Sequence, residues 1–132
     1  MKEENQTDSK TLDSSILFAY FFDKKFQDLI ESETIFFISI LSIFEMKKKM
    51  LEKNVPENVI KEKLKFLRER SIILQLNEKI AGKAAEISIN NKVPAIDSLI
   101  YASSLENNSI FLTLDNDFRG LEKIEILEVD KK

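Results

Sequence analysis

Five acidic residues have the type and placement that phosphodiester chemistry requires, because each lies at the edge of an apolar stretch. They are Asp13, Glu45, Asp97, Asp115 and Asp117, in the contexts TLDSSILFAY, SILSIFEMKKK, PAIDSLIYASSL and FLTLDNDF. Acids positioned by core elements at one end of a sheet repel one another, and cations are needed to balance their charge. Such a cluster is suited to binding Mg²⁺ or Mn²⁺ and to hydrolysing a phosphodiester bond.

Each of these acids also has a purely structural interpretation. Asp13 and Asp97 could cap the N-termini of the helices that follow them. Glu45 lies three residues after Ser42, which is the spacing of a capping box. The segment 115–117, Asp-Asn-Asp, is suited to an Asx-turn. The residues alone therefore leave both interpretations open for every acid.

The composition removes several classes of active site. The chain has 132 residues, enough for one domain with one core, and its 43% hydrophobic and 33% charged content is that of an ordinary globular protein. It has no Cys and no His, which excludes thiolate chemistry, a Ser-His-Asp triad and a typical catalytic zinc site. With only two glycines there is no glycine-rich nucleotide-binding loop.

Charge and hydropathy give weaker indications. The net charge of −3 argues mildly against a nucleic-acid ligand, although cations concentrate in 46–49 and 61–70 and could surround an acidic pocket. The lysines at 47–49 are equally well interpreted as a solvated helix face. We expect no membrane span, since no apolar run approaches 18 residues, and we expect a cytoplasmic location, which the absence of Cys fits.

The elements that must position the acids alternate between short apolar runs and helical patterns. Strands are expected at 11–12, 34–38, 72–74, 110–113 and 124–127, with helices between them that open near Ser42 and Pro56. This alternation predicts an α/β fold with a parallel sheet covered on both faces, in one domain over 1–132 with a polar tail at 1–9. Ligands of such sheets bind beyond the carboxyl ends of the strands, where Asp13 and Asp115 fall.

Four motifs, in this order, resemble those of the PIN-domain family, and most closely its VapC-type toxin ribonucleases. The resemblance covers about residues 11–129. Its motifs are Leu-Asp-Ser-Ser at 12–15, Ser-Ile-Leu-Ser-Ile-Phe-Glu at 39–45, Asp-Ser-Leu-Ile-Tyr-Ala at 97–102 and Thr-Leu-Asp-Asn-Asp-Phe at 113–118. Each motif is weak alone, whereas four in the right order with the right elements between them are specific.

The resemblance implies a three-layer α/β/α fold with strand order 3-2-1-4-5 and an endonuclease acting on RNA. It implies that Mg²⁺ or Mn²⁺ is held by Asp13, Glu45, Asp97 and Asp115, the expected catalytic residues, with Asp117 as a secondary ligand. Ser14 and Thr113 would contact the substrate, although Thr113 could simply favour its strand. The implied partners are an antitoxin and a second copy of the chain.

One feature departs from the family pattern. Residues 6–10 are all polar or charged where the family has a strongly apolar central strand, which motivates an alternative: a catalytically degenerate PIN module that binds RNA or protein. A receiver-type phosphoacceptor fits less well, since such proteins have a paired acid in the loop after the first strand and a Lys at the end of the last strand, and this sequence has neither.

For the homodimer, the expected apolar surface comprises the aromatic residues Phe18, Phe21 and Phe22 and the stripe Ile60, Leu64 and Leu67.

Overall fold

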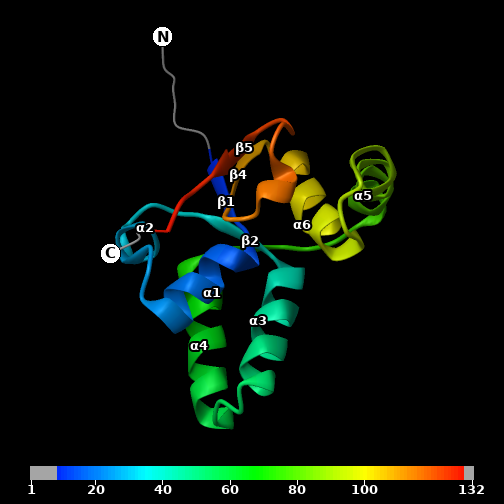
Figure 1. The fold of residues 1–132 in the computed structure, drawn as a ribbon. Helices are drawn as coiled ribbons and strands as arrows, with labels where there is room; N and C mark the ends of the chain where they lie inside the picture. The colour runs from blue at the N-terminus through cyan, green and yellow to red at the C-terminus, as the bar shows by residue number, and fades with distance from the viewer. Residues whose placement is uncertain (1–8, 130–132) are drawn as a thin grey trace.

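The computed structural model describes residues 9–129 and consists of five strands and six α-helices (Figure 1). The strands are β1 (Ser9–Leu12), β2 (Phe37–Ser39), β3 (Ile72–Leu74), β4 (Ser109–Thr113) and β5 (Ile124–Ile126). The helices are α1 (Ser14–Asp23), α2 (Gln27–Glu31), α3 (Ile40–Glu52), α4 (Glu57–Arg70), α5 (Glu78–Asn91) and α6 (Ala95–Glu106), with a short 3-10 turn at Asn116–Phe118. Within residues 9–129, no helix has the length and apolarity that a membrane crossing needs.

The five strands form one parallel sheet in the order β3-β2-β1-β4-β5. This confirms the predicted order and differs from the 2-1-3-4-5 order of receiver-type proteins. The chain moves outward from β1 to β2 and β3 on one side and continues with β4 and β5 on the other. The connections therefore reverse direction between β1 and β4, and the carboxyl ends of these two strands meet where α/β sheets bind ligands.

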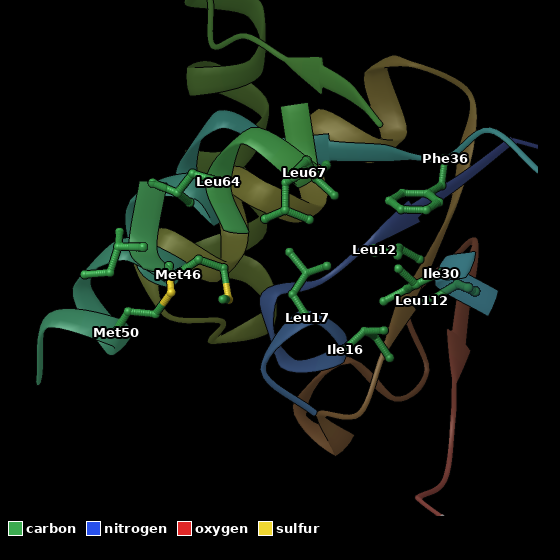
Figure 2. Close-up of a cluster of buried hydrophobic side chains, with 12 residues drawn as sticks. Leu12, Ile16, Leu17, Ile30, Phe36, Met46, Met50, Leu64, Leu67 and Leu112 are labelled. Atoms are coloured by element: carbon green, nitrogen blue, oxygen red, sulfur yellow. The ribbon is translucent and has the colours of Figure 1, made fainter. Parts of the chain in front are cut away.

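Two separate apolar clusters cover the two faces of this sheet. One joins α1, α2, α3 and α4 to Leu12 of β1 and Leu112 of β4, as Figure 2 shows. The other joins α5 and α6 to Phe111, whose ring packs edge-on against Phe118 and at an oblique angle against Tyr101. Because adjacent β4 residues point to opposite clusters, both faces of the central sheet are buried, as expected for a three-layer α/β/α fold.

Hydrogen bonds from buried hydroxyl groups satisfy the polar residues of the central strand. β1 has four residues and pairs with β4 along its whole length. The Thr11 hydroxyl donates to the Ser109 hydroxyl at 2.7 Å, and Ser109 in turn donates to the Ser9 carbonyl at 3.1 Å. Thr11 and Ser109 are both fully buried, so their polar groups satisfy one another inside the core. The central strand is short and partly polar, but paired; residues 6–8 lie outside the described part.

Several expected boundaries need correction. Helix α3 begins at Ile40, with the Ser39 hydroxyl accepting from the Leu41 amide, so the predicted start at Ser42 was wrong and Glu45 forms no capping box with it. β2 covers only Phe37–Ser39 rather than 34–38, and β5 ends at Ile126. Asp97 is the third residue of α6, whose cap position is Pro94, so the N-cap alternative for Asp97 was also wrong.

The helical stripe expected on an exposed apolar surface is instead core. Ile60, Leu64 and Leu67 are all buried, and α4 packs them toward Met46 and Met50 of α3 (Figure 2). The aromatic part of that surface, Phe18, Phe21 and Phe22, is half-buried. Lysine ammonium groups from α3, from its C-cap Lys53 and from α4 lie over the three rings, at 5.2–5.3 Å from the ring centres. This face is therefore partly covered by the chain's own cations.

One arginine substitutes for strand pairing in the segment before β2. The Arg70 guanidinium donates to the carbonyls of Ile30, Ser32 and Thr34 at 2.6, 2.5 and 2.8 Å. It also lies over the Phe36 ring at 4.5 Å. The end of α4 thereby holds the loop that leads into β2, and residues 34–36, expected to be strand, form loop structure instead.

Replacing this guanidinium tests its contribution to stability. Lys cannot donate to three separated carbonyls at once, so Arg70→Lys should lower the free energy of unfolding by about 2 kcal/mol. Chemical denaturation monitored by circular dichroism measures the change. Arg68→Lys on the exposed face of the same helix is the matched control and should change stability by less than about 0.5 kcal/mol. Equal effects of the two substitutions would contradict this role for Arg70.

Candidate functional site

The carboxyl edge of the sheet brings together acids from four separate parts of the chain. Asp13 directly follows β1, and Asp115 lies two residues beyond β4. Glu45 projects from the second turn of α3, which starts immediately after β2, and Asp97 lies in the first turn of α6. All four are within electrostatic range, because Asp13, Glu45, Asp115 and Asp117 each perturb the pKa of Asp97.

Asp13 is the most enclosed of these carboxylates, at 4% exposure. One oxygen accepts from the Ser14 amide at 2.8 Å. The other accepts from the hydroxyls of Ser15 at 2.9 Å and Thr113 at 2.7 Å. Burial raises the pKa of Asp13, the three hydrogen bonds oppose this rise, and the charge of Glu45 adds to it. The carboxylate is thus held in one orientation by donors from both β1–α1 and β4.

The two hydroxyls that bind Asp13 also fix the loop after β4. The Ser15 hydroxyl accepts from the Leu114 amide at 3.1 Å, and the Thr113 hydroxyl accepts from the Asp115 amide at 3.0 Å. Each hydroxyl therefore bridges a carboxylate and a backbone amide. The position of Asp115 is in this way coupled to that of Asp13.

Glu45 is positioned by a single short hydrogen bond. The Ser14 hydroxyl donates to its carboxylate at 2.6 Å, which joins the start of α1 to α3. Ser14 and Thr113 were expected to contact substrate, and here both hydroxyls donate to carboxylates. Their first role in this structure is to orient Asp13 and Glu45, and substrate contact stays a prediction for both.

Asp97 is half-buried and is affected by the like charges of four other acids. Its pKa is raised to about 6, first by desolvation and then by the negative charges of Asp13, Glu45, Asp115 and Asp117. The charged side chains that shift this pKa are all acids. A cation bound near Asp97 would relieve this repulsion between like charges.

Asp115 and Asp117 form the Asx-turn that the sequence allowed. The Asp115 carboxylate accepts from the Asp117 amide at 2.9 Å and caps the short 3-10 turn. Asp115 is half-buried, whereas Asp117 is exposed at the rim. Asp13 likewise combines two roles, because it is the N-cap of α1 as well as a member of the acidic group. Structural and chemical roles are therefore compatible at both positions.

The acids suit a hard divalent cation in chemistry but do not enclose one. Their oxygens are the ligands that Mg²⁺ and Mn²⁺ prefer, and their mutual repulsion is uncompensated. Yet among the described residues no three acidic side chains are arranged so that they could hold an ion. The two observations agree if the acids are near enough to repel but farther apart than coordination requires, because Coulomb forces have the longer range.

Ser15 is the site residue that the motifs did not single out. Its hydroxyl joins Asp13, the Leu114 amide and, at 3.5 Å, the Thr113 hydroxyl. The signal was present in the sequence, since a hydroxyl two residues after a strand-end acid is well placed to bond back to it.

The chain belongs to the PIN domain family, whose family model matches residues 10–124. PIN domains are nucleases, so the class of protein is that of a phosphodiester hydrolase, and the expected membership of the PIN-domain family is confirmed. No curated protein sequence matches this chain.

Solved structures with a similar fold come from bacterial toxin–antitoxin systems. A toxin–antitoxin complex from Klebsiella pneumoniae matches with a TM-score of 0.72 at 19% identity, covering 89% of this chain and 96% of that one. VapBC-1 from nontypeable Haemophilus influenzae gives 0.74 at 15% identity, covering 90% and 96%. VapBC2 from Rickettsia felis, solved with a promoter DNA fragment, gives 0.69 at 16%, covering 92% and 98%. At these identities the likeness is one of fold.

The raised pKa of Asp97 makes the stability of the metal-free protein depend on pH. Because the folded-state pKa of about 6 exceeds the ordinary value of 3.8, the folded state binds the proton more tightly. Stability should therefore fall as pH rises between about 4 and 6 and stay lower above this window. Asp97→Asn removes the charge, and in EDTA at pH 7.5 it should stabilise the fold by about 1 kcal/mol, a value reduced for the partial exposure of the group.

Thermal melting in EDTA at pH 4.5 and 7.5 measures this effect. At pH 4.5 the Asn variant and the parent should differ little, since Asp97 is then mostly protonated in the folded state. Glu69→Gln, at an exposed position on α4, is the control and should show no pH-dependent gain. A variant that is less stable than the parent at pH 7.5 would refute the electrostatic account of Asp97.

Proposed function

We propose that this protein is a divalent-metal-dependent endoribonuclease that acts as the toxin of a toxin–antitoxin pair. The observation that carries the proposal is the convergence of Asp13, Glu45, Asp115 and Asp117 on Asp97, whose pKa is raised first by burial and then by the negative charges of these four acids. A nuclease fold with such a group of acids at the carboxyl edge of its sheet is suited to phosphodiester hydrolysis.

Asp13, Glu45, Asp97 and Asp115 would hold Mg²⁺ or Mn²⁺, with Asp117 contributing from the rim. The cation would supply charge neutralisation at the scissile phosphate and activate water. Asp13 is already oriented by three donors and Glu45 by one. With no His in the chain, a carboxylate is the side-chain base best able to accept the proton of the attacking water.

RNA is the proposed substrate, single-stranded or structured, on the strength of the VapC-type resemblance. Without a cation, the acids would repel the phosphates of the RNA. RNA binding at this site would therefore require the bound metal. The exposed Lys47 and Lys48, on the helix that carries Glu45, could offset part of this repulsion.

The proposed partners are an antitoxin and a second copy of the chain. The similar structures include a toxin–antitoxin complex from Klebsiella pneumoniae and two VapBC structures, which supports an antitoxin here. We infer that it closes the site with a peptide carrying its own cation, since a side-chain cation can balance the acids without supporting hydrolysis. The absence of Cys is compatible with the proposed cytoplasmic location.

A second candidate is a degenerate PIN module that binds RNA or protein without cleaving. It is favoured by one observation: no three acids in the described part of the chain are arranged to hold an ion. The two candidates differ in their response to metal, because only the first requires the acids to close around a cation.

Metal addition should therefore stabilise the protein. An ion that binds only the folded state raises the free energy of unfolding by about 1–3 kcal/mol at concentrations well above its dissociation constant. Melting with and without millimolar Mg²⁺ or Mn²⁺ measures the gain, which should be reduced in Asp97→Asn. Absence of a shift with either ion, together with no ion at the acids in a soaked crystal, would exclude the metal site and favour the degenerate module.

Removing single carboxylates should abolish most cleavage while keeping the fold. We expect Asp13→Asn, Glu45→Gln, Asp97→Asn and Asp115→Asn each to lower the rate on single-stranded RNA at least about 100-fold, and Asp117→Asn to lower it less. Circular dichroism verifies folding, and the remote Glu69→Gln should cleave like the parent. If Asp97→Asn cleaved at the parental rate, the proposed ligand set would be wrong.

A further inference from the structure

Phe44 is the one exposed aromatic residue of this chain. The ten phenylalanines and two tyrosines all lie within residues 9–129, and the other eleven side chains are buried or partly buried. Phe44 is 53% exposed. Single exposed apolar side chains are common on protein surfaces, so the surroundings of this ring decide what it can do.

The ring of Phe44 is not covered by the chain's own groups. Lysine ammonium groups lie over the rings of Phe18, Phe21 and Phe22, whereas within residues 9–129 no cation and no second ring packs against Phe44. Phe44 also belongs to neither apolar cluster. Its flat face is therefore open to a ligand that stacks.

Phe44 directly precedes Glu45, which places the ring at the border of the acidic edge. The Glu45 carboxylate accepts from the Ser14 hydroxyl, and its charge reaches Asp97. Successive helix residues leave the axis about 100° apart and about 1.5 Å along it. The exposed ring therefore lies next to Glu45 on the solvent side, where α3 runs outward from the sheet (Figure 1).

Two lysines extend the surface around this ring. Lys48 is three residues after Glu45 and four after Phe44, so it neighbours both on the helix surface. Lys47 is three residues after Phe44. Both lysines are exposed, and neither forms an ion pair in the part of the chain that the structure describes. Helix α3 thus presents an acid, an aromatic ring and two cations within about one turn.

We propose that Phe44 stacks on the base of an unpaired RNA nucleotide beside the scissile phosphate, while Lys47 and Lys48 contact neighbouring phosphates. The inference rests on the proposed ribonuclease function and names the state of RNA that the site accepts. Aromatic rings combined with cations bind single strands, because every unpaired base offers a flat face. In a duplex that face is already stacked on the adjacent bases.

The position and charge of this surface favour RNA as its occupant. The surface continues directly into the acidic edge, so a strand whose phosphate lies at the acids passes Phe44. An apolar protein partner would instead leave the charges of Lys47 and Lys48 beside an apolar contact, without compensation. A phosphate backbone supplies that compensation at the same two positions.

Stacking at Phe44 should distinguish unpaired from paired nucleotides more than one base from another. On α3 the residues three and four positions from Phe44 are Ile40, Leu41, Lys47 and Lys48. None of them has an amide or carboxylate group that could pair with the edge of a base. A stacking contact without such groups is tolerant of sequence.

Steady-state cleavage of a single-stranded RNA tests the ring. Phe44→Ala should raise KM about 5–100-fold and change kcat less than about threefold, because stacking holds the substrate equally in the ground state and the transition state. Phe44→Trp should keep the parental KM. Leu51→Ala is the matched control, since Leu51 is 56% exposed and lies about two turns further along α3, and it should change KM less than about twofold.

A binding measurement tests the same contact without cleavage. Single-stranded RNAs carrying the fluorescent base 2-aminopurine at successive positions report stacking, with Ca²⁺ replacing Mg²⁺ as the oxygen-bound cation. The parent should quench one position, and Phe44→Ala should lose that quenching. Lys48→Gln should reduce the salt dependence of binding by about 0.7 in the slope of log K against log salt, whereas the exposed Lys65→Gln on α4 should not.

A hairpin RNA tests the requirement for an unpaired base. The parent should cleave a given sequence faster in the loop than in the stem, and Phe44→Ala should reduce this preference. Equal cleavage of loop and stem by the parent would contradict the proposed stacking.

The remaining outcomes separate this inference from the nuclease proposal. If Phe44→Ala kept the parental KM and quenching while RNA was cleaved, or changed only the association with an antitoxin or a second copy, the stacking surface would be wrong and the nuclease would stand. If the parent quenched the probe through Phe44 but cleaved nothing, the nuclease would be wrong and the stacking surface would stand. A parent that neither bound nor cleaved RNA would overturn both.

Discussion

The buried carboxylate of Asp13 is the contact on which the site depends. It ends the central strand, caps α1 and accepts hydrogen bonds from Ser14, Ser15 and Thr113. Burying a charge is costly unless donors compensate it, and here they come from both sides of the point where the sheet reverses its order. The same hydroxyls hold the amides of Leu114 and Asp115, so one carboxylate aligns two strands, a helix start and a loop.

Around this fixed acid, the fold assembles charges of one sign. The apolar clusters on the two faces stabilise the sheet, and the sheet carries the acids to one edge regardless of their repulsion. The cost appears at Asp97, whose pKa is raised while its neighbours surround it without enclosing an ion. The apolar packing of the scaffold thus offsets the repulsion among the acids, which is unfavourable by itself.

Much of this could be predicted because it depends on local patterns. The order of elements, the strand order and the four acid-bearing motifs follow from short segments and from a family resemblance, and the structure confirms the sheet. What could not be predicted depends on contacts between distant segments. Nothing near 34–36 in the sequence shows that Arg70 would hold this segment as loop, and nothing in 6–10 shows that Ser109 would complete a polar strand.

Burial was harder to predict than position. The stripe of Ile60, Leu64 and Leu67 has the same pattern whether a helix face is buried or exposed, and only the packing of α3 against α4 decides between them. Likewise, whether acids that share an edge also share an ion depends on side-chain distances that spacing along the chain does not encode. The charge of Glu45 shifts the pKa of Asp97, but the sequence could not say how near the two acids would lie.

The pairing of β1 with β4 has a consequence for when the protein can act. Thr113 binds Asp13 across 100 residues, and Thr11 binds Ser109 across 98. During synthesis, β1 therefore cannot pair with β4 until nearly the whole chain has been made. A partial chain cannot assemble the acidic edge, since Asp115 and Thr113, one of the three donors to Asp13, come late in the sequence. A chain that ends before β4 therefore lacks both Thr113 and Asp115, and it cannot form the acidic edge.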